Sequence, residues 1–221
     1  MPAAAVELLD ETTPAGAAGA RYRCEVDGVL VGYRLRDEAG HIVMETAWGA
    51  GAPHGLQREW DSDGSLLFEA RYVKGREHGV ARQWQDGRLV GTYRMSHGTG
   101  VDLWRGWNGV LAEERHLLDR QRHGYERWWS GDDRSVWCEE HYRHDIAHGI
   151  FRRWNNRGRL SRGFPRYFVN GERVPKRTYL RRAAVDLSLP PYRPEDNSPR
   201  RTVPPEYAAQ RLPTRSKRPS R

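Results

Sequence analysis

The chain has 221 residues, of which 37% are hydrophobic, and its mean hydropathy of −0.89 is too low for a large closed core. Its net charge of +8 comes entirely from residues 176–221, which hold twelve Lys or Arg against four Asp or Glu. The remaining body is neutral, which argues against the basic face of a nucleic-acid-binding protein. The 9 Trp, 10 Tyr and 23 Gly favour short β-strands joined by tight turns.

Residues 1–21 are predicted to form a disordered leader. They lack the basic residues that open a signal peptide, and Glu7 and Asp10 interrupt the short apolar run. No stretch of the sequence approaches the roughly 18–20 apolar residues that cross a bilayer. Cys24 and Cys138 are far apart in sequence and suit a reducing compartment. We therefore expect a soluble, cytoplasmic protein.

Residues 22–174 are predicted to be an array of about six β-hairpin repeats. The dipeptide His-Gly occurs five times, and an anchoring glycine recurs every 21–25 residues, at Gly32, Gly55, Gly79, Gly100, Gly124 and Gly149. The fourth anchor follows His97-Gly98 as though two residues were inserted there. Polar and apolar side chains alternate with a period of two, as in GLQREW, which is typical of strands. The expected fold is all-β: an open, single-layer antiparallel meander of about twelve strands, in which each repeat contacts mainly its neighbours.

The repeated pattern resembles a known family. Glycine, an apolar residue, tryptophan, a second glycine and leucine recur in that order, and residues 55–79 show them best, as GLQREWDSDGSLLFEARYVKGREHG. This pattern resembles the bacterial variant of the MORN repeat over about residues 28–174. Arrays of that variant are grouped with the YwqK-type antitoxin family of toxin–antitoxin systems. The resemblance implies a non-enzymatic module that binds another protein, with a cognate toxin as the partner.

Two columns of the repeat carry the candidate protein-binding residues. Strand alternation places each arginine on the same face as the tryptophan two positions later, and the set is Arg58, Trp60, Arg82, Trp84, Arg127, Trp129, Arg152 and Trp154. Trp and Arg dominate the binding energy of many interfaces, so these residues form a candidate binding stripe. The alternative is that the guanidinium groups stack on neighbouring indoles and shield the sheet's own aromatic face.

The sequence offers no catalytic constellation, so no enzyme, cofactor, metal or small-molecule substrate is expected. His141 and His144 near Cys138 and Glu139 form the densest titratable cluster, yet alternation places Cys138 and Glu139 on opposite faces. Histidines of successive repeats should lie roughly 10 Å apart, too far to share one zinc ion. A turn or packing role is therefore favoured over a metal site or a pH-responsive role. The two cysteines should lie roughly 40 Å apart and remain unpaired.

The C-terminal part is predicted to cover the end of the array with a helix and to continue as a flexible tail. Pro175 suits the start of a helix, and residues 175–186 are expected to cap the last repeat. Residues 187–221 contain eight prolines and are predicted to form a flexible, Pro/Arg-rich tail. This basic tail supports a second interpretation, a structural scaffold or an adaptor for an anionic membrane. Nucleic acid is not an expected partner, because blocks of like charge are more often solvating tails.

Overall fold

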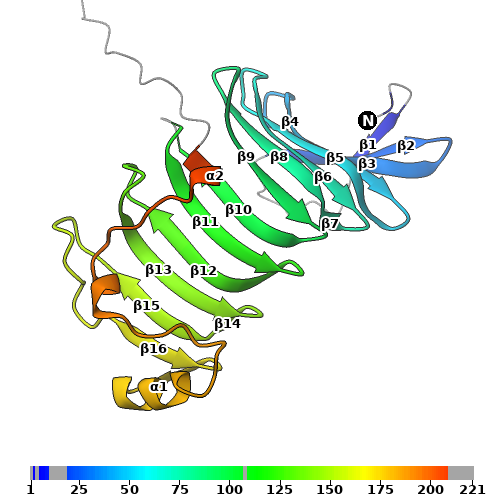
Figure 1. Ribbon diagram of the computed structural model, residues 1–221. Coiled ribbons are helices and arrows are strands. Elements are labelled where there is room, and N and C mark those ends of the chain that lie inside the picture. The colour runs from blue at the N-terminus through cyan, green and yellow to red at the C-terminus, as the bar shows by residue number, and fades with distance from the viewer. Residues whose placement is uncertain (1, 3–4, 10–18, 107–108, 209–221) are drawn as a thin grey trace, which may run out of the picture. The chain divides into compact units, whose positions relative to one another are not determined.

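The computed structural model describes residues 2, 5–9, 19–106 and 109–208 (Figure 1), of which more than half lie in β-strands, and the longest helix has eight residues. The chain divides into two units, Met1–Thr99 and Gly100–Arg221, which we call the N-terminal and C-terminal units. Each unit contains an open antiparallel sheet. No helix in these ranges is both long and apolar enough to cross a membrane.

The N-terminal unit is a meander in which each strand pairs with the next one along the chain. Its strands are β1 (Val6–Leu9), β2 (Ala20–Val26), β3 (Val29–Arg36), β4 (Ile42–Gly49), β5 (Ala52–Trp60), β6 (Leu66–Val73), β7 (Arg76–Glu77), β8 (Gly79–Gln85) and β9 (Arg88–Ser96). β7 holds only two residues, so β6 pairs with both β7 and β8.

The C-terminal unit continues the same pattern and adds the helices. Its strands are β10 (Thr99–Arg105), which begins at the boundary, β11 (Leu111–Leu118), β12 (Gln121–Trp129), β13 (Val136–Arg143), β14 (Ile146–Ala147), β15 (Gly149–Arg153), β16 (Arg166–Val169) and β17 (Glu172–Val174). They are followed by α1 (Lys176–Ala183), the 3-10 helix η1 (Pro194–Asn197) and α2 (Pro205–Ala208). The prediction of an open all-β meander is confirmed. More strands form than the twelve expected, partly because single residues separate the short β7 and β14 from the strands after them.

Two-residue turns set the register of the hairpins. Asp27-Gly28, Asp86-Gly87 and Asn170-Gly171 all have positive φ at both positions. This backbone matches the right-handed twist of paired strands, and Asp-Gly and Asn-Gly favour it. Two of the anchoring glycines, Gly55 and Gly149, have a different role. A Cβ at Gly55 would lie 2.8 Å from the Cβ of Ala47, and one at Gly149 would lie 2.6 Å from that of His141, so no side chain fits between these neighbouring strands.

The predicted disordered leader is wrong for residues 6–9, which form β1. Its backbone pairs with β2 from Val6 opposite Glu25 to Leu9 opposite Tyr22. The carboxylate of Glu7 lies 2.6 Å from Arg34 and 2.8 Å from Arg36, so β1 covers the edge of β2 and also forms ion pairs with two arginines. Residues 10–18 lie outside the described residues.

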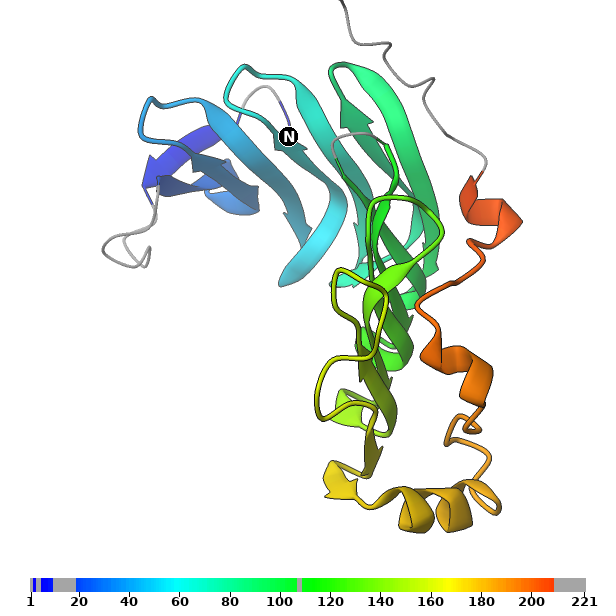
Figure 2. The same cartoon turned by 90° about the vertical axis from the view of Figure 1, so that its left-hand side faces the viewer.

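The predicted flexible tail is wrong for residues 187–208, which we call the C-terminal segment. After α1, whose Tyr179 packs with Ile150, Tyr167 and Leu189, this segment turns back and runs along one face of the C-terminal sheet (Figure 2). Its backbone forms an isolated antiparallel bridge between Arg200 and Ser135. At its far end the carbonyl of Tyr207 accepts a hydrogen bond from Arg105. Residues 209–221 lie outside the described residues.

Candidate protein-binding face

One row of alternating arginine and glutamate crosses each sheet, and we call it the Arg/Glu row. In the N-terminal unit directly opposed residues on consecutive long strands give Arg34, Glu45, Arg58, Glu69 and Arg82. In the C-terminal unit they give Glu114, Arg127, Glu139 and Arg152. Because directly opposed residues lie on the same face, each charge has an opposite charge on the adjacent strand.

Four arginines of this row were predicted from the sequence, but its glutamates were not. A signal for them was present: Glu45, Glu69 and Glu139 each lie three residues before the aromatic residue that recurs in the repeat, at Trp48, Tyr72 and Tyr142. Arg34 was also missed, because the first repeat places its arginine two residues after the anchoring glycine instead of three.

In the N-terminal unit the predicted arginines are partly open to solvent. Arg58 Nε lies 2.8 Å from Glu69 Oε2, and Arg82 Nη1 lies 3.4 Å from Glu69 Oε1. Their side chains are 35% and 45% exposed. Trp60 and Trp84 are each half-buried. This part of the face is therefore accessible to another molecule.

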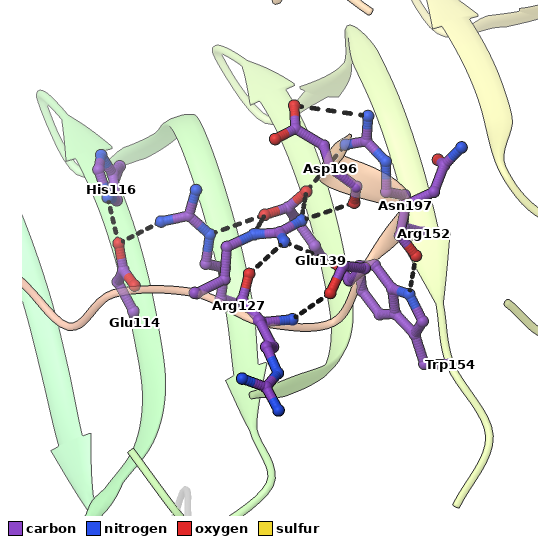
Figure 3. A network of polar contacts seen from close by, with 11 residues as sticks. Glu114, His116, Arg127, Glu139, Arg152, Trp154, Asp196 and Asn197 are labelled. Atoms are coloured by element: carbon purple, nitrogen blue, oxygen red, sulfur yellow. Dashed lines mark hydrogen bonds and ion pairs between the residues drawn. The ribbon is translucent and has the colours of Figure 1, made fainter. Parts of the chain in front are cut away.

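In the C-terminal unit the same row is buried. Arg127 donates to Glu114 and to Glu139, each at 2.9 Å, and Arg152 donates to Glu139 at 2.9 Å (Figure 3). The side chain of Arg127 is 17% exposed and that of Arg152 only 2%. Burial raises the pKa of the Glu139 carboxyl, but contacts with Arg201 and Arg127 outweigh it and hold the pKa at about 2. Glu139 is thus an anion over the whole physiological range.

The C-terminal segment buries this part of the row. The guanidinium of Arg201 donates to both carboxylate oxygens of Glu139, at 2.9 and 3.0 Å, a bidentate arrangement that is among the strongest ion pairs in proteins. Asp196 of the same segment lies 3.9 Å from Arg152. A bound segment of the chain therefore matches the row's positive and negative charges at once (Figure 3).

Backbone and tryptophan contacts complete the attachment of the segment. The N–H of Val136 donates to the carbonyl of Pro199 at 3.0 Å, and the N–H of Arg201 donates to the carbonyl of Arg134 at 2.9 Å. Trp154 Nε1 donates to the carbonyl of Asn197 at 2.7 Å. These contacts join the segment to the start of β13 through a single antiparallel bridge, a minimal form of the strand pairing by which many domains bind peptides.

The tryptophans of the predicted stripe fall into two groups. Trp129 and Trp154 are buried in the C-terminal unit, whereas Trp60 and Trp84 remain half-buried in the N-terminal unit. The alternative prediction placed the arginines of the column on neighbouring indoles. Among the residues described, these arginines pair with glutamates. Arg127 also lies over the ring of Tyr125, at 4.2 Å from its centroid, and the cation over the Trp154 ring is Arg201, at 5.4 Å.

Three histidines of the His-Gly dipeptides, which we call the histidine column, accept hydrogen bonds from the backbone of neighbouring turns. The Nδ1 atoms of His54, His78 and His148 accept from the backbone N–H groups of Lys74, His97 and Asn170, at 3.5, 3.3 and 3.1 Å. Each donor is the first residue of a two-residue turn with positive φ. His97 is therefore a turn residue and not a member of the column, which explains why the fourth repeat seemed to carry an insertion. The predicted turn role is confirmed for His54, His78 and His148, whereas the buried Nδ1 of His123 has no hydrogen-bond partner among the described residues.

Other titratable groups do not form a reactive cluster within the described ranges. No group of three or more His, Cys, Asp or Glu side chains there could hold a metal ion. Cys138 lies 3.8 Å from Glu140, whereas Glu139 faces the arginines, so the predicted opposite orientation of Cys138 and Glu139 is confirmed. Burial raises the pKa of the Cys138 thiol to about 11, which leaves little nucleophilic thiolate at neutral pH.

The sequence matches no model of a known protein family and no curated protein. The MORN-type resemblance therefore stays a prediction, and the function must be argued from the Arg/Glu row.

Proposed function

We propose that this protein is a non-enzymatic binding module that holds a segment of a partner protein against the Arg/Glu row of its N-terminal unit. One observation carries the proposal: the same row in the C-terminal unit already holds residues 187–208, a segment without strands that includes η1 and α2, through two ion-paired side chains and backbone hydrogen bonds. The surface thus has the chemistry of a peptide-binding face.

The exposed state of the N-terminal row supports this location. Arg58 and Arg82 are the most exposed of the four arginines in the predicted stripe, and each is paired only with Glu69 among the residues described. Half-buried tryptophans lie two positions after them. Partly desolvated Arg and Trp side chains are typical of the residues that dominate binding energy.

The finer proposal concerns the partner. Resemblance to bacterial antitoxin arrays favours a toxin that this protein neutralises in the cytoplasm. The alternative, an anionic-membrane adaptor or scaffold, would use the basic charge of residues 187–221. Arg201 of that region is bound to Glu139 and is 12% exposed, so it is withdrawn from such a role.

The test begins with affinity purification from the native host and continues with the purified partner. Changing Arg82→Ala should weaken partner binding by about tenfold or more, corresponding to about 1.4 kcal/mol. The matched control is Arg88→Ala, an exposed arginine that strand alternation places on the other face, and it should change the affinity less than about twofold. Equal affinities for the wild type, Arg82→Ala and Trp84→Ala would refute binding at this face.

A further inference from the structure

Glu69 and Glu139 occupy corresponding places in the two units. Each lies between two arginines on the flanking strands, Arg58 and Arg82 in one case and Arg127 and Arg152 in the other. Two residues after the second arginine stands Trp84 or Trp154. The N-terminal unit therefore repeats the framework of the site that holds the C-terminal segment.

The C-terminal site shows what this framework binds. Arg201 places its guanidinium on the carboxylate of Glu139 and over the indole of Trp154. Asp196, five residues earlier, faces Arg152. The segment thus presents one anion and one cation at a spacing that matches neighbouring members of the row.

At Glu69 the framework is present without such an occupant in the part of the chain that the structure describes. Glu69 contacts Arg58 at 2.8 Å and Arg82 at 3.4 Å, and its side chain is 17% exposed. In the C-terminal unit the corresponding second arginine, Arg152, lies 2.9 Å from Glu139. The second arginine of the N-terminal unit, Arg82, is therefore held less closely by its glutamate. The Glu69 carboxylate is accessible to a further donor, and the exposed Arg82 is accessible to a further anion.

We propose that the Glu69 site binds an arginine of a partner segment, and that an acidic residue five positions before this arginine, in a single turn like that of η1, binds Arg82. The inference deepens the proposed function and rests on it, because it names the chemistry of the segment that the N-terminal row takes up. Arginine is preferred to lysine, since its planar guanidinium can donate to both oxygens of one carboxylate. The paired acidic residue is required because a lone arginine would add a third cation beside Arg58 and Arg82.

The chain's own sequence supplies the probe. A capped peptide with the sequence of residues 194–203, PEDNSPRRTV, is titrated into the full-length protein by isothermal titration calorimetry. The Glu139 site is occupied by the same sequence within the chain, whose effective concentration is in the millimolar range for such tethered segments. The peptide should therefore bind at the Glu69 site. Replacing the second arginine of the peptide by lysine should weaken binding by about tenfold.

Variants of the protein locate the site. Glu69→Gln should weaken peptide binding by about tenfold or more, whereas Glu59→Gln, on the opposite face of β5, should leave it within about twofold. Arg82→Gln leaves the Arg58–Glu69 pair in place and provides a second test if Glu69→Gln folds poorly. In Arg82→Gln, a peptide with asparagine in place of its aspartate should bind as well as the original peptide.

Two results would overturn the inference. The first is peptide binding that is the same in the wild type, in Glu69→Gln and in Arg82→Gln when circular dichroism shows all three to be folded. The second is binding only to a chain that ends at residue 208, because the protein's own residues 209–221 would then occupy the site. If the purified partner still depends on Arg82 while the peptide fails to bind, the arginine inference is refuted and the proposed function stands.

Discussion

At the scale of single residues, the two units differ in how deeply the corresponding ion pairs of the Arg/Glu row are buried. Around Glu139 three guanidinium groups converge in a largely buried site, whereas around Glu69 two guanidinium groups remain in contact with solvent. A buried charge that loses its partner keeps its desolvation penalty, while an exposed charge is solvated again. Identical substitutions in the two units should therefore have very different effects.

We expect Glu139→Gln to destabilise the C-terminal unit by about 3 kcal/mol, because it leaves the buried Arg152 and the ordered Arg201 without their common anion. The matched change Glu69→Gln should cost less than about 1 kcal/mol. Urea denaturation measures both, and hydrogen exchange of β13 and β6 assigns each loss to its unit. Equal losses would contradict the difference in burial between the two sites.

The pH dependence of this effect follows from the lowered pKa of Glu139, which is about 2 in the folded protein. The folded state binds this proton less readily than the unfolded state, whose carboxyl pKa is about 4.3. The stabilisation by Glu139 is thus fully present above the unfolded value and is lost as the pH falls towards 2. The stability difference between wild type and Glu139→Gln should shrink over the same range.

His148 should make the C-terminal unit sensitive to mild acid. Its side chain is fully buried, and its Nδ1 accepts from Asn170 while its Nε2 lies 3.0 Å from Ser188 Oγ and 3.7 Å from Asp186. Burial lowers the pKa of this imidazole, and the nearby carboxylate of Asp186 only partly opposes the effect. The unfolded chain therefore takes up the proton first, and stability falls as the pH drops below about 6.5.

The change His148→Asn tests this, because an amide oxygen can still accept from the N–H of Asn170. We expect the variant to lose less stability than the wild type between pH 7.5 and pH 5.5, measured as the shift of the urea midpoint. The control is His41→Asn, which changes an exposed histidine in the N-terminal unit and should keep the wild-type pH dependence. A wild type that is equally stable at both pH values would contradict the prediction.

At the scale of elements, the strands and turns could be predicted from the sequence, whereas the coverings of the sheet could not. Alternation and Asp-Gly or Asn-Gly turns are local signals, so the hairpins were visible without a structure. β1 and the C-terminal segment depend on distant partners: Glu7 meets Arg34 and Arg36, and Arg201 meets Glu139. Eight prolines after residue 187 suit an extended chain, but composition does not distinguish a free extended chain from one bound along a sheet.

Four of the nine residues of the Arg/Glu row were predicted from the sequence, because their signal is also local. The tryptophans recur at regular intervals along the sequence, and each arginine lies two residues before its tryptophan. The glutamates oppose these arginines across the sheet, and that pairing depends on strand register, which bulges such as the one between Glu59 and Trp60 shift by one residue.

Removal of residues 187–221 should destabilise the C-terminal unit by several kcal/mol. It removes Leu189 from the core formed with Ile150, Tyr167 and Tyr179, which alone contributes about 2 kcal/mol, and it also removes Arg201 from Glu139. Hydrogen exchange in β13 and β15 should become faster while exchange in β5 stays the same. A chain that ends at residue 208 is the matched control and should exchange like the full-length protein. If β15 kept its protection in the chain that lacks residues 187–221, the C-terminal segment would contribute nothing to the fold.

At the scale of the whole molecule, the two cysteines report separately on the two units. Cys24 lies in the N-terminal unit and Cys138 in the C-terminal unit, and both are free and buried. Burial raises the pKa of both thiols, that of Cys138 to about 11. Each thiol should therefore react with an alkylating reagent only after its own unit opens.

We expect Cys24 to be labelled at a lower urea concentration than Cys138. In the C-terminal unit, α1 and the C-terminal segment add the core around Tyr179 and bury the Arg/Glu row, whereas the row of the N-terminal unit is partly solvated. Short pulses of reagent at increasing urea, followed by mass spectrometry of the two cysteine peptides, give one unfolding curve for each unit. Superimposable curves would show that the repeats unfold as one cooperative array. Separate curves would show that the array divides into a stable part, which the C-terminal segment covers, and a more easily opened part that contains the proposed binding face.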